Sequence, residues 1–144
     1  MHKALAELLK QLKLTLAADA PAVKAGISGS LAAALEEIAR RPGIGVAAAA
    51  ESLGITTASA SALISKLSDQ GYVVKQRAQD DRRAVALYVT NKGKAMAERI
   101  RTFRFSFAQK LLAGLGEEER LEFIRLFAKA LDSLPHEQEG ENAS

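Results

Sequence analysis

Two neighbouring stretches of this chain hold the side chains that could do chemistry. One carries Arg77, Arg82 and Arg83 beside two aspartates. Guanidinium groups bind phosphate or carboxylate through charge-assisted hydrogen bonds, so this stretch could bind a polyanion. The other stretch offers hydroxyl side chains and one lysine, which can bond to phosphates or to the edges of bases. Its candidate residues are Thr57, Ser59, Ser61 and Lys66.

Acid–base, metal and nucleophilic chemistry have few candidates. The two histidines, His2 and His136, stand near opposite ends of the chain, so neither a metal site nor a base for the serines is indicated. Cysteine is absent, which excludes disulfides, thiolate metal sites and cysteine-based oxidant sensing. The segment 43–45 is too short for a phosphate loop and lacks the lysine. The acids at 117–119 could bind a cation, but they also suit a helix start. We therefore predict no enzyme activity, no metal and no cofactor.

Positive charge is concentrated in one part of the chain. From Lys66 to Arg104 there are ten basic and four acidic residues, a net charge of +6, whereas the remaining residues carry −3. Such a concentration attracts phosphate-bearing polymers to one face. A solvated basic surface would give the same counts, so charge alone leaves both interpretations open.

Length and hydropathy set the scale of the fold. The chain has 144 residues, 48% of them hydrophobic, which is enough for one core. No apolar run is long enough to cross a bilayer, and Glu7, Lys10 and Lys13 interrupt the leucines near the N-terminus, so no signal peptide is expected. We predict a cytoplasmic protein with no membrane partner.

The hydroxyl-rich stretch is predicted to lie on the second of two helices joined by a tight turn. The first helix runs from about Ala47 to Leu53 and ends at a glycine, and the second runs from Thr57 to Gln70. The three residues between them, 54–56, match the connection of a helix-turn-helix. A slim helix of this kind fits the major groove of DNA, whereas the alternative is an ordinary exposed helix. The expected inward positions are Ala60, Leu63, Ile64 and Leu67.

The arginine-rich stretch is predicted to connect two strands. Residues 72–76 and 85–89 are rich in β-branched and aromatic side chains, which predicts an antiparallel hairpin. The polar connection, 77–84, is longer than an ordinary hairpin loop. An arginine on such a ribbon can enter a narrow minor groove, and the aspartates would order the loop. A solvated charged hairpin is the alternative.

Four further helices are predicted around this unit. Leucines at helical spacing near the N-terminus favour burial against other helices over a position on a membrane surface. The helix after Thr90 carries an apolar stripe at intervals of three and four, which suits helix pairing. The expected ranges are His2 to about Ala18, Ser28 or Ser30 to Arg40, Thr90 to Leu115, and Glu117 to Leu134.

Two of these motifs resemble those of the MarR family of winged helix-turn-helix transcriptional regulators. The segment 44–71 is similar to the family's helix-turn-helix, especially over 51–56 and 63–71. The family's wing signature follows it, with Val89 in place of the more usual leucine. The resemblance covers roughly residues 27–98 by motif and the flanking helices by pattern only. The wing signature reads Asp81-x-Arg83-x-x-x-Leu87-x-Val89-Thr90-x-x-Gly93.

The resemblance implies an obligate homodimer bound to double-stranded DNA. The first and the last two helices of two chains would interleave and hold two winged domains over a pseudo-palindromic site, with recognition helices about 34 Å apart. Regulators of this family commonly bind a small, often aromatic, ligand between the dimerisation helices and the winged domain, which weakens DNA binding. A small-molecule effector is therefore implied as well.

Two positions depart from the family's pattern. Where Ser65 stands, many relatives have an aspartate that pairs with the wing arginine, and where Ala62 stands, an arginine or another long side chain is frequent. The absence of a long side chain at Ala62 corresponds to a loss of about 1–3 kcal/mol of discrimination between bases. Either this protein reads DNA mainly through shape and phosphate contacts, or it has drifted from strong DNA binding.

These observations lead to one prediction of fold and function. The fold is mainly α with a small β-hairpin, a winged helix-turn-helix domain flanked by N- and C-terminal dimerisation helices. The function is a dimeric DNA-binding regulator that represses transcription and is relieved by a small ligand. A winged-helix dimer that serves as a protein-interaction module is the alternative, and an enzyme comes a distant third. The predicted divisions are 1–26 for the N-terminal dimerisation helix, 27–92 for the winged domain, 93–134 for the C-terminal dimerisation helices and 135–144 for a disordered tail.

Overall fold

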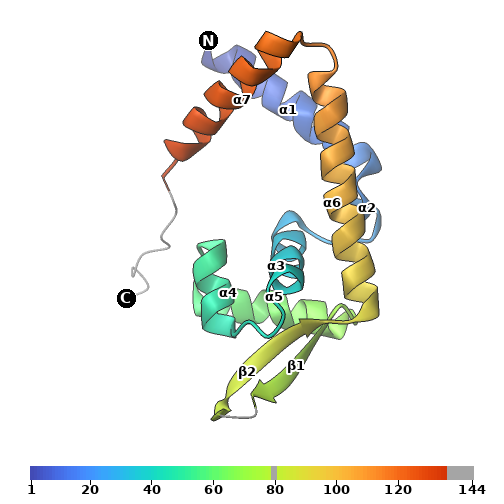
Figure 1. Ribbon diagram of the computed structural model, residues 1–144, viewed down its shortest axis with the longest axis vertical. Coiled ribbons are helices and arrows are strands. Elements are labelled where there is room, and N and C mark those ends of the chain that lie inside the picture. Colours follow the sequence, from blue (N-terminus) through green and yellow to red (C-terminus); the bar gives the residue numbers. More distant parts are fainter. Residues whose placement is uncertain (79–80, 136–144) are drawn as a thin grey trace.

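A long helix connects a small α/β unit at one end of the molecule to two amphipathic helices at the other end (Figure 1). The computed structural model describes residues 1–78 and 81–135, without the side chains of 78 and 81–83. The predicted tail, 135–144, lies outside the described residues except for Pro135. The long helix is α6 (Asn91–Leu112), and the two helices at its far end are α1 (His2–Asp19) and α7 (Glu117–Asp132).

The winged unit contains three helices and a two-stranded sheet, which we call the winged domain. Its helices are α3 (Gly29–Arg40), α4 (Val46–Leu53) and α5 (Thr57–Asp69), close to the predicted ranges. Fully burying a large apolar side chain contributes roughly 1.5–3 kcal/mol, so a small set of residues holds these elements together. The largest fully buried side chains are Leu35, Ile38, Ile64, Leu67, Val73 and Leu87.

Local sequence signals set the helix ends of this domain. The Ser28 hydroxyl accepts a hydrogen bond from the amide of Leu31 at 3.2 Å, and the Thr56 hydroxyl accepts one from the amide of Ser59 at 3.1 Å. Such caps satisfy amides that have no partner within the helix. Gly54 ends α4 with φ +67°, a left-handed conformation that glycine adopts without strain. The helix-turn-helix predicted from the spacing is therefore present.

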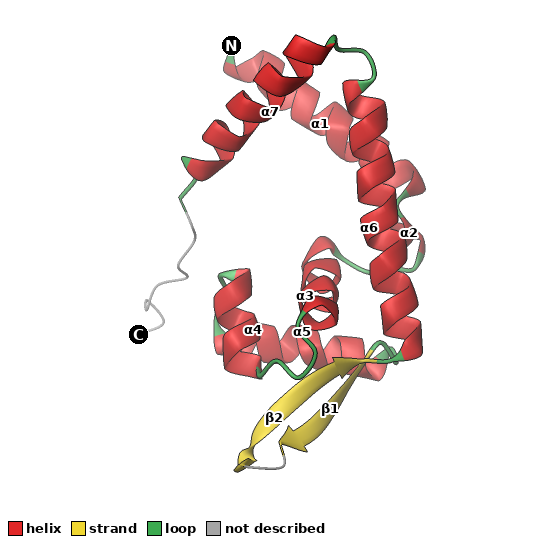
Figure 2. Cartoon of the chain, viewed as in Figure 1, coloured by secondary structure: helices red, strands yellow, loops and turns green. Residues whose placement is uncertain are grey.

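The sheet is an antiparallel hairpin of β1 (Val73–Ala78) and β2 (Asp81–Val89), shown as the two yellow arrows of Figure 2. The prediction of a polar connection over 77–84 was wrong, because Arg77 pairs with Val85 and both strands extend further. The next pair is Ala78 with Asp81, so residues 82–84 are extra residues on β2. Extra residues of this kind bend a strand and increase its twist. At the base, Ile44 adds a single antiparallel bridge to Leu87.

Two connections differ from the sequence expectations. A one-turn helix, α2 (Pro21–Lys24), was not predicted, because the break at Pro21 is also a good first helical position. The long helix α6 ends at Leu112 rather than near Leu115. Here Arg120 of α7 donates from Nε to the carbonyls of both leucines at 3.0 Å, which satisfies the end of α6. Across the described ranges, no helix combines the length and apolar character needed to cross a membrane.

The first turn of α6 packs directly on the backbone between α5 and β1. The Thr90 hydroxyl donates to the carbonyl of Gly71 at 2.6 Å and accepts from the amide of Gly93 at 3.0 Å. The Thr90 amide also donates to the carbonyl of Tyr72 at 3.0 Å. A Cβ on Gly93 would overlap the Tyr72 carbonyl, so only glycine allows this approach. We call this contact the α6 joint.

A network around Glu37 ties α3 to α4. Its carboxylate accepts hydrogen bonds from Arg40 at 2.7 Å and from the hydroxyl of Ser52 at 2.7 Å, and only 11% of its side chain is exposed. Its pKa lies below the ordinary value, chiefly because of the hydrogen bond from Arg40, with a further contribution from Ser52. The charged form of Glu37 therefore stabilises the folded state.

We predict that Gly93→Ala destabilises the protein by at least about 2 kcal/mol, because the added methyl group must push α6 away from Tyr72. Chemical denaturation measured by circular dichroism gives the free energy of unfolding. Gly29→Ala is the matched control, since its Cβ would meet nothing within 4 Å in the first turn of α3. Equal stability of the two variants would contradict the close approach at the α6 joint.

We predict that Glu37→Gln lowers the free energy of unfolding at neutral pH by about 1 kcal/mol or more, because charge-assisted hydrogen bonds are lost. The pKa of Glu37 is lower in the folded state than in the unfolded state. The stability that its charge contributes is therefore complete above the unfolded-state pKa and is lost as the pH falls through the folded-state pKa. The difference from the unmodified protein should therefore shrink between roughly pH 6 and pH 3. Thermal melts across that range measure it, with Glu51→Gln on α4 as the control. A difference that stays constant with pH would overturn the assignment.

Candidate nucleic-acid interface

The exposed face of α5 carries the hydroxyl-rich residues that the sequence singled out. Its inner face is fixed by Ala60, Ile64 and Leu67, all buried. Thr57, Ser61 and Lys66 are exposed, but Thr57 and Lys66 are separated by about two and a half helical turns, so these two side chains point in opposite directions. Ser59 is placed differently.

Ser59 has a structural role in the helix start. It is only half-exposed, its amide donates to the Thr56 hydroxyl, and its own hydroxyl accepts from Thr56 at 2.9 Å. A hydroxyl that already accepts a bond within the cap has less capacity for a base or a phosphate. A contact between Ser59 and DNA stays a prediction.

Lys75 is a basic residue beside this face that the sequence reasoning did not assign. Its Nζ donates to the hydroxyl of Ser65 on α5 at 3.3 Å, and both side chains are exposed. A lysine therefore stands next to the position where many relatives carry an aspartate. Alternate residues of a strand lie on the same face, so Lys75 shares a face of β1 with the buried Val73. This alternation is the sequence signal that could have placed Lys75 on the side of β1 that faces the helices.

The wing places the other predicted arginines at the far end of the hairpin. Arg77 is exposed on β1, on the same face as Lys75. Arg82 and Arg83 belong to β2 within its extra residues, and their side chains lie outside the described part of the structure. Figure 1 shows the hairpin projecting beyond α5 at the end of the molecule opposite α1 and α7. Their contacts with DNA stay predictions.

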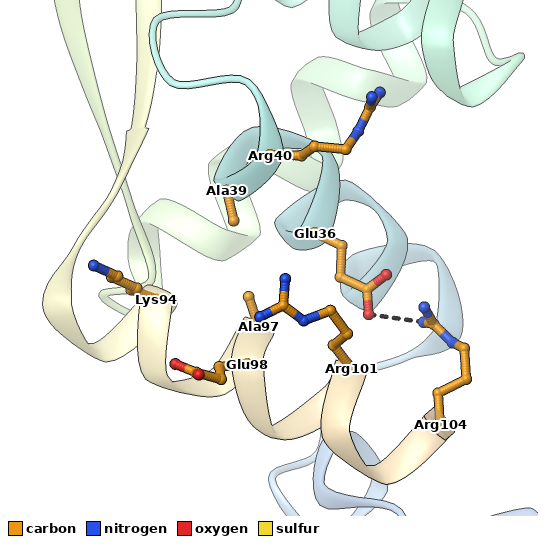
Figure 3. A pocket seen from close by; sticks show the side chains of 8 residues that line it. All are labelled: Glu36, Ala39, Arg40, Lys94, Ala97, Glu98, Arg101 and Arg104. Atoms are coloured by element: carbon orange, nitrogen blue, oxygen red, sulfur yellow. Dashed lines mark hydrogen bonds and ion pairs between the residues drawn. The ribbon is translucent and has the colours of Figure 1, made fainter. Parts of the chain in front are cut away.

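The structure divides the basic segment between two surfaces. Lys66, Lys75 and Arg77 belong to α5 and β1, whereas Arg101 and Arg104 lie on α6 against α3 (Figure 3). The charge counted along the sequence therefore does not form one patch.

One lysine of the basic segment is used within the fold. Lys92 donates from Nζ to the carbonyl of Gln70 at 2.8 Å and lies 4.5 Å from the centroid of the Tyr72 ring. These contacts make Lys92, although exposed, part of the α6 joint.

The described residues offer no site for metal chemistry. Within 1–78 and 81–135, no group of three or more histidine or acidic side chains is placed to hold a metal ion. The arrangement instead offers hydroxyls, lysines and arginine at the end of a helix and along a ribbon. Those groups bind phosphates and base edges.

Comparisons with known proteins identify the relatives of this fold. Residues 25–84 match the sequence pattern of the MarR family. A multiple antibiotic-resistance repressor (MarR) from Listeria monocytogenes is 30% identical, with 91% of this chain and 94% of that chain covered and a TM-score of 0.57. Among the curated proteins no match is found.

Two further solved structures share the fold at lower identity. FabT from Streptococcus pneumoniae, in complex with DNA, is 22% identical, covering 92% of this chain and 93% of that one, with a TM-score of 0.70. The PcaV transcriptional regulator from Streptomyces coelicolor, in complex with its natural ligand, is also 22% identical, covering 90% of each chain, with a TM-score of 0.66. At this identity the likeness concerns the fold alone.

Proposed function

This chain belongs to the MarR family and is a DNA-binding transcriptional regulator, and from that premise we propose that it acts as a homodimeric repressor of a pseudo-palindromic operator. Regulators of this family are not enzymes. The observation that carries the proposal is the shared surface of α5 and the hairpin, where small hydroxyl side chains stand beside basic ones.

The proposed DNA contacts divide between the two grooves. The proposed major-groove contacts are the exposed Thr57, Ser61 and Lys66 of α5, together with Ser59 at the start of the helix. The face is slim because Ala62 and Ser65 carry no long side chain, so the helix can approach the groove floor. Hydroxyls and alanine discriminate bases less strongly than arginine, asparagine or glutamine do. Affinity then depends mainly on phosphate contacts, to which Lys75 would contribute.

The wing supplies the proposed minor-groove contact. Arg77 is exposed on β1, and residues 82–84 interrupt the regular pairing of β2. An arginine carried on a twisted ribbon suits the narrow minor groove of A·T-rich DNA, where the negative potential is strongest. We assign this insertion to Arg82 or Arg83.

The dimer is proposed from apolar faces that one chain leaves exposed. Neither α1 nor α7 contains a buried residue, although both carry an apolar stripe at helical spacing. On α7, Leu121 is 67% exposed and Phe127 is 49% exposed. Exposed apolar area of this extent marks a protein interface.

The proposed dimer interface includes a groove in which a helix of the partner chain could pack. Its volume is about 370 Å³, and it is formed by α1, α2 and α6, with Leu12, Leu16 and Phe103 among its lining residues. We propose that the partner chain's α7 packs into this groove. The interface would then be formed by the two segments proposed for dimerisation, 1–26 and 93–134. A twofold axis through such an interface would set the two α5 helices about one DNA turn apart.

A small-molecule effector completes the proposal. The α6 joint and the packing of α3 on α6 connect the dimer interface to the winged domain. A ligand that prefers a spacing of the two α5 helices that does not fit the operator would weaken DNA binding without touching DNA. That the structure of PcaV holds its natural ligand supports this part of the proposal.

We predict that binding to DNA from the region upstream of the protein's own gene weakens with salt, with a log–log slope of several units, at about 0.9 per phosphate neutralised. Arg82→Ala combined with Arg83→Ala should weaken binding at least about tenfold at fixed salt, because the wing contact is lost. Fluorescence anisotropy measures both quantities.

The matched control for the wing is Lys3→Ala combined with Lys10→Ala, which removes the same charge from α1. Equal effects of the two double variants would remove the wing from the mechanism. Undetectable binding at low salt would favour the alternative, a winged-helix protein-interaction module.

We predict that light scattering reports a dimer at micromolar concentration and that Phe127→Glu yields a monomer, because a charge would enter the apolar interface. Lys129→Glu introduces a glutamate elsewhere on α7 and should leave the dimer intact. A monomeric unmodified protein, or a Phe127→Glu variant that remains dimeric, would contradict the proposed interface.

A further inference from the structure

A cavity of about 410 Å³ lies between α3 and the first half of α6 (Figure 3). Small side chains leave this space open, because Ala39 of α3 and Ala97 of α6 face each other across it. The volume falls within the range of about 300–1,000 Å³ that is usual for small-ligand sites. The cavity therefore has room for a ligand.

Charged side chains surround the cavity, with an excess of positive charge. Two acids, Glu36 and Glu98, line it, against four basic residues. Two of those basic groups already have carboxylate partners, because Arg104 bonds to Glu36 at 2.7 Å and Arg40 bonds to Glu37. The basic residues are Arg40, Lys94, Arg101 and Arg104.

Arg101 is the basic group best placed to receive a ligand. In Figure 3 its side chain extends from α6 into the space between the two helices. Within the described part of the chain, it makes no hydrogen bond or ion pair. A guanidinium fork binds a carboxylate or a phosphate through two parallel hydrogen bonds, so Arg101 can accept such a group at no cost to an existing pair.

The ion pair between Arg104 and Glu36 shows what chemistry the cavity accepts. Glu36 is mostly buried, with 24% of its side chain exposed, and its carboxylate reaches Arg104 from α3 to α6. A ligand anion could replace this carboxylate on Arg104 while a second anionic group of the same molecule binds Arg101. A ligand with one anionic group could pair with Arg101. It would have to displace Glu36 to bind Arg104 as well.

We propose that this cavity is a binding site for a compact anion that carries at least two carboxylate or phosphate groups, held by Arg101 and Arg104 with Lys94 and Arg40 at its edges. The site differs in chemistry from the apolar groove of α1, α2 and α6. Glu36 competes with the ligand, because the carboxylate and the anion need the same guanidinium.

Binding at this site has a consequence for regulation, which rests on the proposed function. Arg40 and Glu36 belong to the winged domain, and Arg101 and Arg104 belong to the helix that leads to the proposed dimer interface. An anion that displaces Glu36 from Arg104 removes the direct ion pair between α3 and α6 and replaces it with a contact through the ligand. The ligand-bound spacing of α3 and α6 then competes with the spacing that fits DNA.

Isothermal titration calorimetry on the full chain without DNA tests the site itself. Citrate and pyrophosphate are the two probes, acetate is the monovalent control, and sodium chloride keeps the ionic strength constant. We expect at least one of the two probes to bind with a Kd below about 1 mM and acetate to bind at least about tenfold more weakly. Binding of citrate but not pyrophosphate would identify a carboxylate ligand. Binding of pyrophosphate but not citrate would identify a phosphate ligand.

Three variants assign the binding to the cavity. Arg101→Ala should weaken probe binding at least about tenfold, and Glu36→Gln should strengthen it about threefold because the competing charge is gone. Arg99→Ala removes an α6 arginine that does not line the cavity and should change nothing. Binding of neither probe, or equal losses in Arg101→Ala and Arg99→Ala, would overturn the proposal.

A DNA readout separates this site from the proposed function. At matched ionic strength, a saturating probe should weaken operator binding at least about fivefold in the unmodified protein and leave Arg101→Ala unaffected. Failure to bind any DNA would refute the proposed function, while the calorimetric result on the anion site would stand. Probe binding with no effect on operator affinity would refute the regulatory consequence alone.

Discussion

The close approach of α6 to the backbone at Tyr72 is the constraint on which the rest of the structure depends. Gly93 permits that approach, and Thr90 fixes it by bonding to both Gly71 and Gly93. The contact sets the direction in which α6 leaves the winged domain. It therefore sets where α1 and α7 stand relative to α5 and the hairpin, because those two helices lie at the far end of α6 (Figure 1). This joint and the packing of α3 on α6 are two connections through which a motion at one end can reach the other end.

The basic residues of the segment 66–104 are divided among three places once the chain is folded. Lys66 and Lys75 stand on the surface proposed for DNA, whereas Lys92 stabilises the α6 joint. Arg101 and Arg104 face α3 and surround the cavity. A run of basic residues along a sequence therefore gives the sign of the local potential but not the number of sites, because helices and strands send neighbours in different directions.

Most of the winged domain could be predicted because its signals are local. Glycine and threonine at 54 and 56 define the turn of the helix-turn-helix, and the caps found there match the expected ones. The hairpin was predicted too short, because pairing beyond Arg77 depends on three extra residues in β2 that no periodicity marks. The contact between Lys75 and Ser65 also escaped prediction. It joins a strand to a helix ten residues earlier, and only the packing of the two elements brings their side chains together.

The sequence by itself determined the family, the order of every element except α2 and the residue types proposed to contact DNA, since each depends on short-range spacing, caps and a wing signature that ends at Gly93. Only the tertiary structure decided how these residues are used. It assigned Ser59 to a cap, separated the basic residues into different surfaces and opened a cavity between α3 and α6. The ion pair between Glu36 and Arg104 joins residues 68 positions apart. Such a partner follows from how two helices pack, which no local pattern specifies.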